Sequence, residues 1–237
     1  MTQSEVLTFA RCAGFVFRAP GFSHPSVPPA LRAGVAAIFT MGLAPTLRAA
    51  HPISGIAFIC AIAGELAVGA AIGIAASVLY DGAYAGGRAL DDYVGIRGSV
   101  PSAAVVAGSG FGRIWSLVFL GGFFLLDGYH IVIRVFADSF ERLPAGSVVA
   151  VKPMYLFAVS LPWLILKAAI LTAAPAIALT FVAQVALGAL TRVIPRFSSF
   201  TLSFPVVFAV ALLATLAAVP VVLPLAAQPW LRLPFVK

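Results

Sequence analysis

Residues 86–112 read GGRALDDYVGIRGSVPSAAVVAGSGFG, in the middle of a chain that is 62% hydrophobic. The stretch holds two adjacent acids, two arginines and many Gly, Ala and Ser residues. A lipid-facing helix could not hold it, because each charge at the centre of a bilayer costs roughly 2.5–3.5 kcal/mol. The stretch is therefore expected to face protein or water, between apolar regions that precede and follow it.

The whole chain has the composition of a membrane protein. Its 237 residues have a mean hydropathy of +1.07, and only 10% of them are charged, against about 25% in soluble domains. We expect an all-α membrane protein with one integral membrane domain over residues 1–237. The 15 basic residues outnumber the 8 acidic ones but are scattered singly, which favours contact with lipid head groups over nucleic-acid binding.

The apolar segments predict the helical regions. They lie at residues 6–17, 33–47, 53–80, 114–136, 154–190 and 202–227. Segment 154–190 is too long for one crossing, since about 20 helical residues cross a ~30 Å hydrocarbon layer. Pro162 and Pro175 each remove a backbone donor, so this segment is predicted to form two helices, or a hairpin, that part near Pro175. Long breaks are expected at 81–112 and 138–153.

Ionisable residues interrupt several of these segments. Glu65 and Lys167 lie inside apolar segments, and Asp127, His130 and Arg134 interrupt another. Such residues face protein or water rather than lipid. A polar Asp127–His130 pair at a helix–helix contact is the preferred interpretation, and a proton- or cation-coupled transporter that uses Glu65, Asp127 and His130 is the alternative.

Small residues suggest how one helix packs. Gly69, Gly73 and Ser77 recur every four residues and would form one flat helix face, on which a second helix can approach closely. Cys12 and Cys60 lie far apart in apolar surroundings, so both are expected to be small core residues.

The sequence offers little for catalysis or cofactor binding. It has no H-E-x-x-H motif, no Cys/His cluster and no P-loop, which argues against a zinc site and against nucleotide hydrolysis by this chain. Residues 107–111, AGSGF, superficially resemble the G-x-S-G of intramembrane serine proteases, but Val106 stands where the first Gly belongs. We expect no enzyme activity, no metal and no cofactor.

Four blocks distributed along the chain carry a family resemblance. They lie at residues 17–45, 86–95, 127–146 and 191–206, and they resemble, in order, motifs of the FliR/SctT proteins of the bacterial type III export apparatus. The matching residues are Val27, Pro28, Arg32, Pro45, Gly87, Asp91, Gly95, Gly128, His130, Ser139, Phe140, Leu143, Pro144, Gly146, Arg192, Pro195, Phe200, Phe204 and Pro205. The chain departs from the family at Val100, where an Asp usually precedes Pro101, and at Arg88, where flagellar members often have an acid.

The resemblance implies a non-enzymatic subunit of the export gate in the bacterial inner membrane, within the basal body of a flagellum or injectisome. The expected partners are FliP/SctR-type and FliQ/SctS-type subunits, together with FlhB/SctU-type and FlhA/SctV-type proteins, and the expected substrates are unfolded proteins. The family's architecture implies helical hairpins arranged as a short spiral, with much of the assembly raised above the membrane plane.

The resemblance also gives residues 95–112 a role, as a mobile loop that projects into the pore and helps to plug it. Glycines would supply backbone freedom, and Ser and Ala would supply little bulk. The implied plug residues are Gly95, Arg97, Gly98, Ser99, Pro101, Ser102, Ala103, Ala104, Gly108, Ser109 and Gly110.

Overall fold

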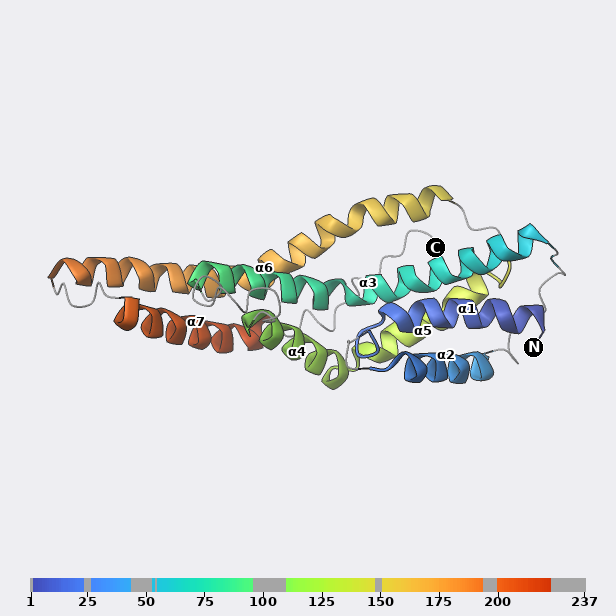
Figure 1. Ribbon diagram of the computed structural model, residues 1–237, viewed down its shortest axis with the longest axis horizontal. Coiled ribbons are helices and arrows are strands. Elements are labelled where there is room, and N and C mark those ends of the chain that lie inside the picture. Colours follow the sequence, from blue (N-terminus) through green and yellow to red (C-terminus); the bar gives the residue numbers. More distant parts are fainter. Residues whose placement is uncertain are drawn as a thin grey trace. The chain divides into compact units, whose positions relative to one another are not determined.

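Every regular element that we describe in this chain is an α-helix, in the order α1 to α7 (Figure 1). A computed structural model describes residues 2–23, 27–43, 53, 55–95, 110–147, 151–193 and 200–222. The helices are α1 (Gln3–Arg18), α2 (Pro29–Leu43), α3 (Ile56–Val94), α4 (Gly110–Leu125), α5 (Gly128–Arg142), α6 (Val151–Val193) and α7 (Phe200–Val222). The predicted all-α class is confirmed.

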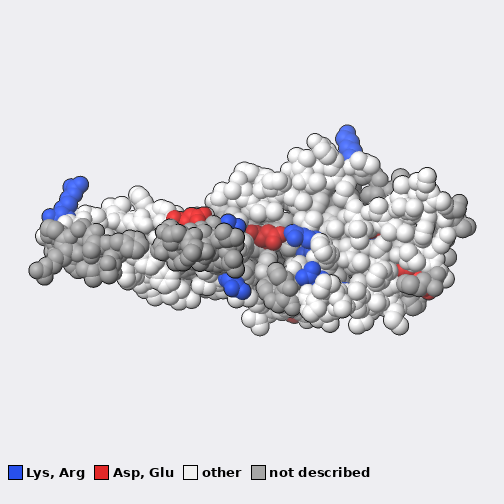
Figure 2. Space-filling model, viewed as in Figure 1, with Lys and Arg blue, Asp and Glu red and all other residues white. Residues whose placement is uncertain are grey.

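Three of the described helices are long and apolar enough to cross a membrane: α3, α6 and residues Phe204–Val222 of α7. There are four candidate spans if α4 and α5 are taken together as one broken span. Large apolar side chains are exposed along these helices, and charged side chains are sparse in the view of Figure 2. The chain is a membrane protein.

Several predicted boundaries were wrong, among them the break at 138–153, since α5 continues to Arg142 and α6 begins at Val151. Helix α6 runs for 43 residues through Pro162 and Pro175 without ending, because a proline in a membrane helix removes one backbone donor without ending the helix when neighbouring groups compensate. Helix α3 continues to Val94, so residues 81–94 do not form a break. Its glycines there lie at helix contacts, and Ala83, Leu90 and Val94 are buried.

The segment predicted at 114–136 is divided between α4 and α5. Asp127, which precedes α5, has a left-handed backbone with φ of 57°. A non-glycine residue rarely adopts this conformation, and it cannot continue a right-handed helix. The break therefore has a local cause, and α5 begins immediately after it.

The helices pack into two compact units. Unit 1 contains α1, α2, α3 as far as Val78, α5, and α6 as far as Pro162. Unit 2 contains the rest of α3 from Leu79, α4, α6 from Trp163, and α7. The single-domain prediction for 1–237 stays a prediction.

The core of unit 1 is aromatic, and α1 and α2 lie side by side in it (Figure 1). The rings of Phe15 in α1 and Phe136 in α5 are stacked with centroids 4.3 Å apart, and Phe39 of α2 meets both. Phe15 and Phe136 are almost completely buried. Aromatic pairs of this kind contribute about 0.5–1.5 kcal/mol beyond the area that they bury, so they help to join three helices of this unit.

The core of unit 2 consists of two apolar clusters. Phe111 of α4 packs with Leu90, Ala176 and Ala211 from the other three helices, and Trp115 and Phe119 pack with Ala83 and Ala218. The small alanines allow the helices to lie close together where lipid offers no hydrophobic driving force for association.

Candidate functional site

The G-x-x-x-D-x-x-x-G element lies in the last turns of α3, within unit 2. Its first glycine, Gly87, touches the start of α4. A Cβ atom at Gly87 would lie 2.5 Å from the Cα and N atoms of Gly112 and from the carbonyl oxygen of Phe111. Since a side chain there would collide with backbone, only glycine lets the two helices approach this closely.

Asp91 lies one turn further along α3 and is buried, with 1% of its surface exposed. Its Oδ1 atom accepts a hydrogen bond of 3.0 Å from the backbone N–H of Phe111. This N–H belongs to the first turn of α4, where N–H groups have no partner within the helix. A carboxylate is also the favourable charge at a helix N-terminus. Asp91 therefore caps α4 from α3.

Gly95 ends α3. Its φ is +82°, and its N–H donates to the carbonyl oxygens of Asp91 (3.1 Å) and Asp92 (3.2 Å). Glycine adopts this left-handed conformation without the cost that other residues incur. The three residues of the element thus have distinct positions: Gly87 at a close contact, Asp91 at a cap and Gly95 at a helix end.

The residues between these two helix ends include most of the predicted plug. Gly95 ends α3 and Gly110 begins α4. The other predicted plug residues lie outside the described residues and stay predictions: Arg97, Gly98, Ser99, Pro101, Ser102, Ala103, Ala104, Gly108 and Ser109.

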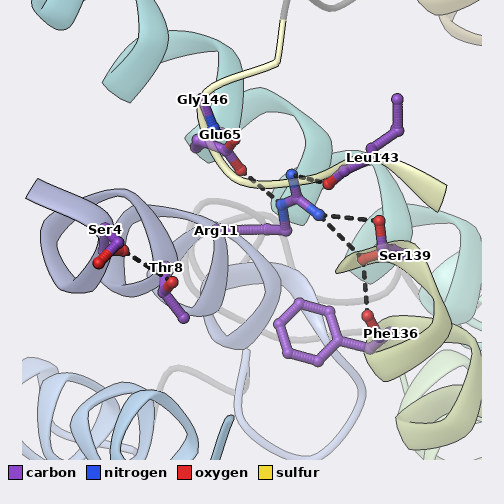
Figure 3. Close-up of polar contacts among 8 residues, drawn as sticks. All are labelled: Ser4, Thr8, Arg11, Glu65, Phe136, Ser139, Leu143 and Gly146. Atoms are coloured by element: carbon purple, nitrogen blue, oxygen red, sulfur yellow. Dashed lines mark hydrogen bonds and ion pairs between the residues drawn. The ribbon is translucent and has the colours of Figure 1, made fainter. Parts of the chain in front are cut away.

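A second polar site lies in unit 1, around Arg11 (Figure 3). Arg11 is fully buried, and its Nε atom donates to Oε2 of Glu65 at 2.5 Å. Its Nη1 atom donates to the carbonyl (3.0 Å) and hydroxyl (3.4 Å) oxygens of Ser139, and its Nη2 atom to the carbonyl of Leu143 (2.8 Å). These carbonyls lie at the C-terminal end of α5, where a cation is the favourable charge.

Glu65 completes this site. Its Oε1 atom accepts a hydrogen bond of 2.8 Å from the N–H of Gly146, in the turn that follows α5. The Arg11 guanidinium lies 4.3 Å from the centre of the Phe140 ring. Ser139, Phe140, Leu143 and Gly146, all from the third family block, therefore meet at the Arg11–Glu65 pair. The sequence analysis missed Arg11, although a lone arginine in the apolar stretch around residues 6–17 could have marked it.

Glycines allow α1 to lie against α3 next to this pair. A Cβ at Gly73 would lie 2.7 Å from the Phe15 carbonyl, and a Cβ at Gly69 would overlap the Arg11 carbonyl. From the opposite side, a Cβ at Gly14 would overlap the carbonyl of Leu66. The buried Ser77 donates its hydroxyl to the Ile74 carbonyl of its own helix.

The prediction that Asp127 and His130 form a polar pair at a helix–helix contact was wrong. Their side chains are 71% and 65% exposed, with Nδ1 of His130 3.8 Å from Oδ1 of Asp127. The left-handed backbone at Asp127 places it before α5 rather than inside a continuous helix. Within the described parts of the chain, no three His, Cys, Asp or Glu side chains gather as a metal site would require. Glu65 is instead bound to Arg11.

The remaining family-motif residues occupy varied positions. Pro28 accepts hydrogen bonds from the N–H groups of Leu31 and Arg32 at the start of α2, and Arg32 Nη2 donates to the Ser23 carbonyl at 3.4 Å. Phe204 packs against the Phe111 cluster. Further along the chain, Gly128 is buried, Arg192 is exposed at the end of α6, Pro205 lies inside α7, and Pro195 lies outside the described residues.

The two cysteines differ. Cys12 is buried in α1, which is not one of the candidate membrane spans. Burial raises the pKa of its thiol to about 11, although a hydrogen bond with Thr40 lowers it in part. Cys60 is exposed, so its predicted place in the core was wrong.

Comparisons with known proteins match nearly the whole chain. The model of a family described as "Bacterial export proteins, family 1" matches residues 3–233. The flagellar biosynthetic protein FliR of Escherichia coli is 25% identical over 90% of this chain and 83% of its own length. FliR of Pectobacterium carotovorum is 24% identical over 92% and 85%. The secretion system apparatus protein SsaT of Salmonella typhimurium is 26% identical over 67% and 62%.

Proposed function

Since this chain belongs to the family of bacterial export proteins described as family 1, we propose that it is a non-enzymatic subunit of a type III secretion export gate. In this proposal it forms, with FliP/SctR-type and FliQ/SctS-type partners, an inner-membrane pore through which unfolded proteins leave the cell. The FliR/SctT resemblance inferred from sequence is confirmed, and its relatives serve flagellar biosynthesis and a secretion system.

One observation carries the pore role. The stretch 86–112, whose charges a lipid-facing helix could not hold, includes the small-residue segment 96–109 between α3 and α4, and Asp91 joins the facing ends of these helices. A stretch rich in Gly, Ala and Ser between two apolar helices fits a plug of little bulk inside a protein pore, so we assign residues 95–112 to it.

The lengths of α3 and α6 support an assembly that extends beyond the bilayer. Helices of 39 and 43 residues contain about twice the ~20 residues that cross the hydrocarbon layer. Partner subunits covering the exposed apolar side chains, and the family's spiral arrangement, would account for helices of this length.

The transporter alternative has no comparable support. Its three residues are divided between a buried ion pair and an exposed pair. A coupling site would need ionisable groups that face one cavity or pathway. The arrangement of Glu65 with Arg11 is that of a structural pair.

The proposal is tested by co-purification and ion leak. Tagged chain, co-expressed with FliP/SctR-type and FliQ/SctS-type subunits, is expected to elute with both after membrane solubilisation. Deletion of residues 99–107, which leaves Gly95 and Gly110 in place, is expected to increase KCl efflux from liposomes that contain the complex. A chain that never co-purifies with these subunits, or a deletion complex as tight as the parent, would contradict the proposal.

A further inference from the structure

A row of polar side chains follows one face of the last turns of α3, in unit 2. Tyr84, Arg88 and Asp92 recur every four residues, and Asp81 precedes Tyr84 by three. Residues at these spacings share one helix face. Arg88 and Asp92 are exposed, and the Arg88 guanidinium lies 5.9 Å from the centre of the Tyr84 ring. We call Asp81, Tyr84, Arg88 and Asp92 the polar stripe.

The other side of these turns packs against the neighbouring helices of unit 2. A Cβ at Gly86 would lie 2.6 Å from the carbonyl oxygen of Ala169 in α6. Leu90 is buried in the apolar cluster with Ala176 of α6 and Ala211 of α7. The polar stripe therefore lies on the side of α3 that the other helices of unit 2 leave largely uncovered.

The polar stripe runs beside a long apolar run of α6. Residues 168–191 contain no ionisable residue, and this run is longer than the ~20 residues that cross a hydrocarbon layer. The contacts of α3 with Ala169, Ala173 and Ala176 all fall inside it. The exposed charges of Arg88 and Asp92 are therefore level with a part of α6 that suits the interior of a membrane.

Neither lipid nor a partner subunit is a favourable neighbour for these charges. Each charge at the centre of a bilayer costs roughly 2.5–3.5 kcal/mol, and a short aspartate cannot reach the head groups as a long arginine can. A partner subunit would have to pair each charge that it buries, and the cores of protein interfaces are depleted of charged residues. Water imposes neither cost.

We propose that the polar stripe faces water in the assembled export gate and forms part of the wall of its passage. This inference rests on the proposed function and adds to it the side of α3 that faces the exported polypeptide. The stripe carries charges of both signs, and the exposed Arg113 follows Gly112 directly at the contact of α4 with α3. A wall of mixed sign would retain neither acidic nor basic polypeptides, whereas rings of one sign select by charge.

The first test measures how fast single cysteines in the assembled complex react with a membrane-impermeant trimethylammonium-ethyl methanethiosulfonate, present on both sides of liposomes. The background is Cys60→Ser, in which the remaining Cys12 is buried and its pKa is about 11, so that little of it is the reactive thiolate. Arg88→Cys and Asp92→Cys are expected to react about tenfold faster than Leu213→Cys, at an exposed apolar position of α7, because thiolates form in water rather than in apolar surroundings.

Potassium efflux then distinguishes a passage from the outer surface of the complex. Complexes that lack residues 99–107 are placed in liposomes loaded with KCl. Reaction at Arg88→Cys or Asp92→Cys attaches a bulky cation to the wall through a disulfide and should lower efflux about twofold. The reagent should change efflux neither in the Cys60→Ser background nor in Leu213→Cys.

The outcomes separate this inference from the proposed function. Fast reaction with lowered efflux supports the inference. Slow reaction at the stripe positions, or fast reaction that leaves efflux unchanged, overturns it and leaves the export-gate proposal standing. If one stripe variant does not assemble, Tyr84→Cys takes its place. A tight deletion complex, or a chain that never co-purifies with its partners, overturns both.

Discussion

Units 1 and 2 both bury an ionisable side chain at the end of a neighbouring helix, with opposite charges. In unit 1, Arg11 of α1 binds carbonyls at the C-terminal end of α5. In unit 2, Asp91 of α3 binds an N–H at the N-terminal end of α4. Each charge has the sign that the helix dipole favours. Arg11 and Asp91 thus serve the termini of other helices, where several backbone groups lack partners within the helix.

The two sites differ in what surrounds the charge. Arg11 is paired with Glu65 and contacts the Phe140 ring, and Glu65 also binds the turn after α5. In unit 2, the Asp91–Phe111 bond adjoins an apolar cluster and a glycine contact. Arg11 holds the end of α5 and Glu65 holds the turn after it, so removal of either side chain leaves the other buried charge without its counter-charge. Unit 1 should therefore be the more sensitive to loss of one charge.

The largest expected effect comes from removal of one partner of the buried pair. Arg11→Met leaves Glu65 as an unpaired buried carboxylate and should reduce the free energy of unfolding by about 3–5 kcal/mol. Glu65→Gln should also be strongly destabilising, because an amide has one acceptor oxygen: if that oxygen accepts the Gly146 N–H, its NH2 group faces the Arg11 Nε–H, and the buried guanidinium loses its counter-charge. Thermal unfolding of the detergent-solubilised chain measures both.

The double variant Arg11→Met/Glu65→Met tests how much of this loss comes from the unpaired charge. It removes both charges but leaves the Leu143 carbonyl and the Gly146 N–H without these partners. It should therefore recover only part of the loss of Arg11→Met. A double variant as stable as the parent chain would show that the backbone contacts contribute little, and the comparison between the units would lose its basis.

The sequence could predict the class of fold but not this pair. Composition and the lengths of apolar segments are averages over many residues, so a few atypical residues do not change them. The predicted all-α membrane class was right. The partner of Glu65 is 54 residues away, and no local spacing signals a contact at that range. The same limit applies to Asp91, whose bond to Phe111 spans 20 residues, although the family motif had singled Asp91 out.

Substitutions of glycines in α3 are the second test of the difference between the units, because these glycines allow close helix contacts in both units. Gly69→Ala in unit 1 and Gly86→Ala in unit 2 each direct a methyl group at the backbone of a neighbouring helix, Arg11 of α1 and Ala169 of α6 respectively. Each should reduce the free energy of unfolding by about 1–3 kcal/mol through overpacking. Similar losses would place the difference between the units in their charges rather than in their helix packing.

A control for these variants exists in α2. A Cβ at Gly34 would meet nothing within 4 Å, so Gly34→Ala should leave the chain unchanged or stabilise it by about 0.5–1 kcal/mol through helix propensity. The measurement is the same unfolding experiment. A loss at Gly34 as large as that at Gly69 would mean that any methyl group on these helices is harmful, and that close contact is not the cause.

Local sequence patterns also could not decide whether a glycine lies in a loop or at a close helix contact. The four-residue spacing of Gly69 and Gly73 marks a helix face, and α1 lies against it. The same residue type in 81–94 suggested a break, because glycine favours both loops and close contacts. Buried neighbours such as Leu90 distinguish the two cases, and burial depends on tertiary packing. Asp127 stands in an Asp-Gly pair, a common turn signal, but the structure was needed to show that this pair divides the segment 114–136 into two helices.

The smallest effects should come from the exposed charges of unit 1, in contrast to its buried pair. Asp127 and His130 are 71% and 65% exposed with 3.8 Å between their charged atoms, and such surface pairs contribute about 0–1 kcal/mol. His130→Ala should therefore change the free energy of unfolding by less than about 0.5 kcal/mol. Asp127→Ala should cost more than Asp127→Asn, because Asn tolerates the left-handed backbone at φ of 57° and Ala does not. If its charges held the pair together, Asp127→Asn, Asp127→Ala and His130→Ala would all cost about the same, whatever backbone conformation residue 127 requires.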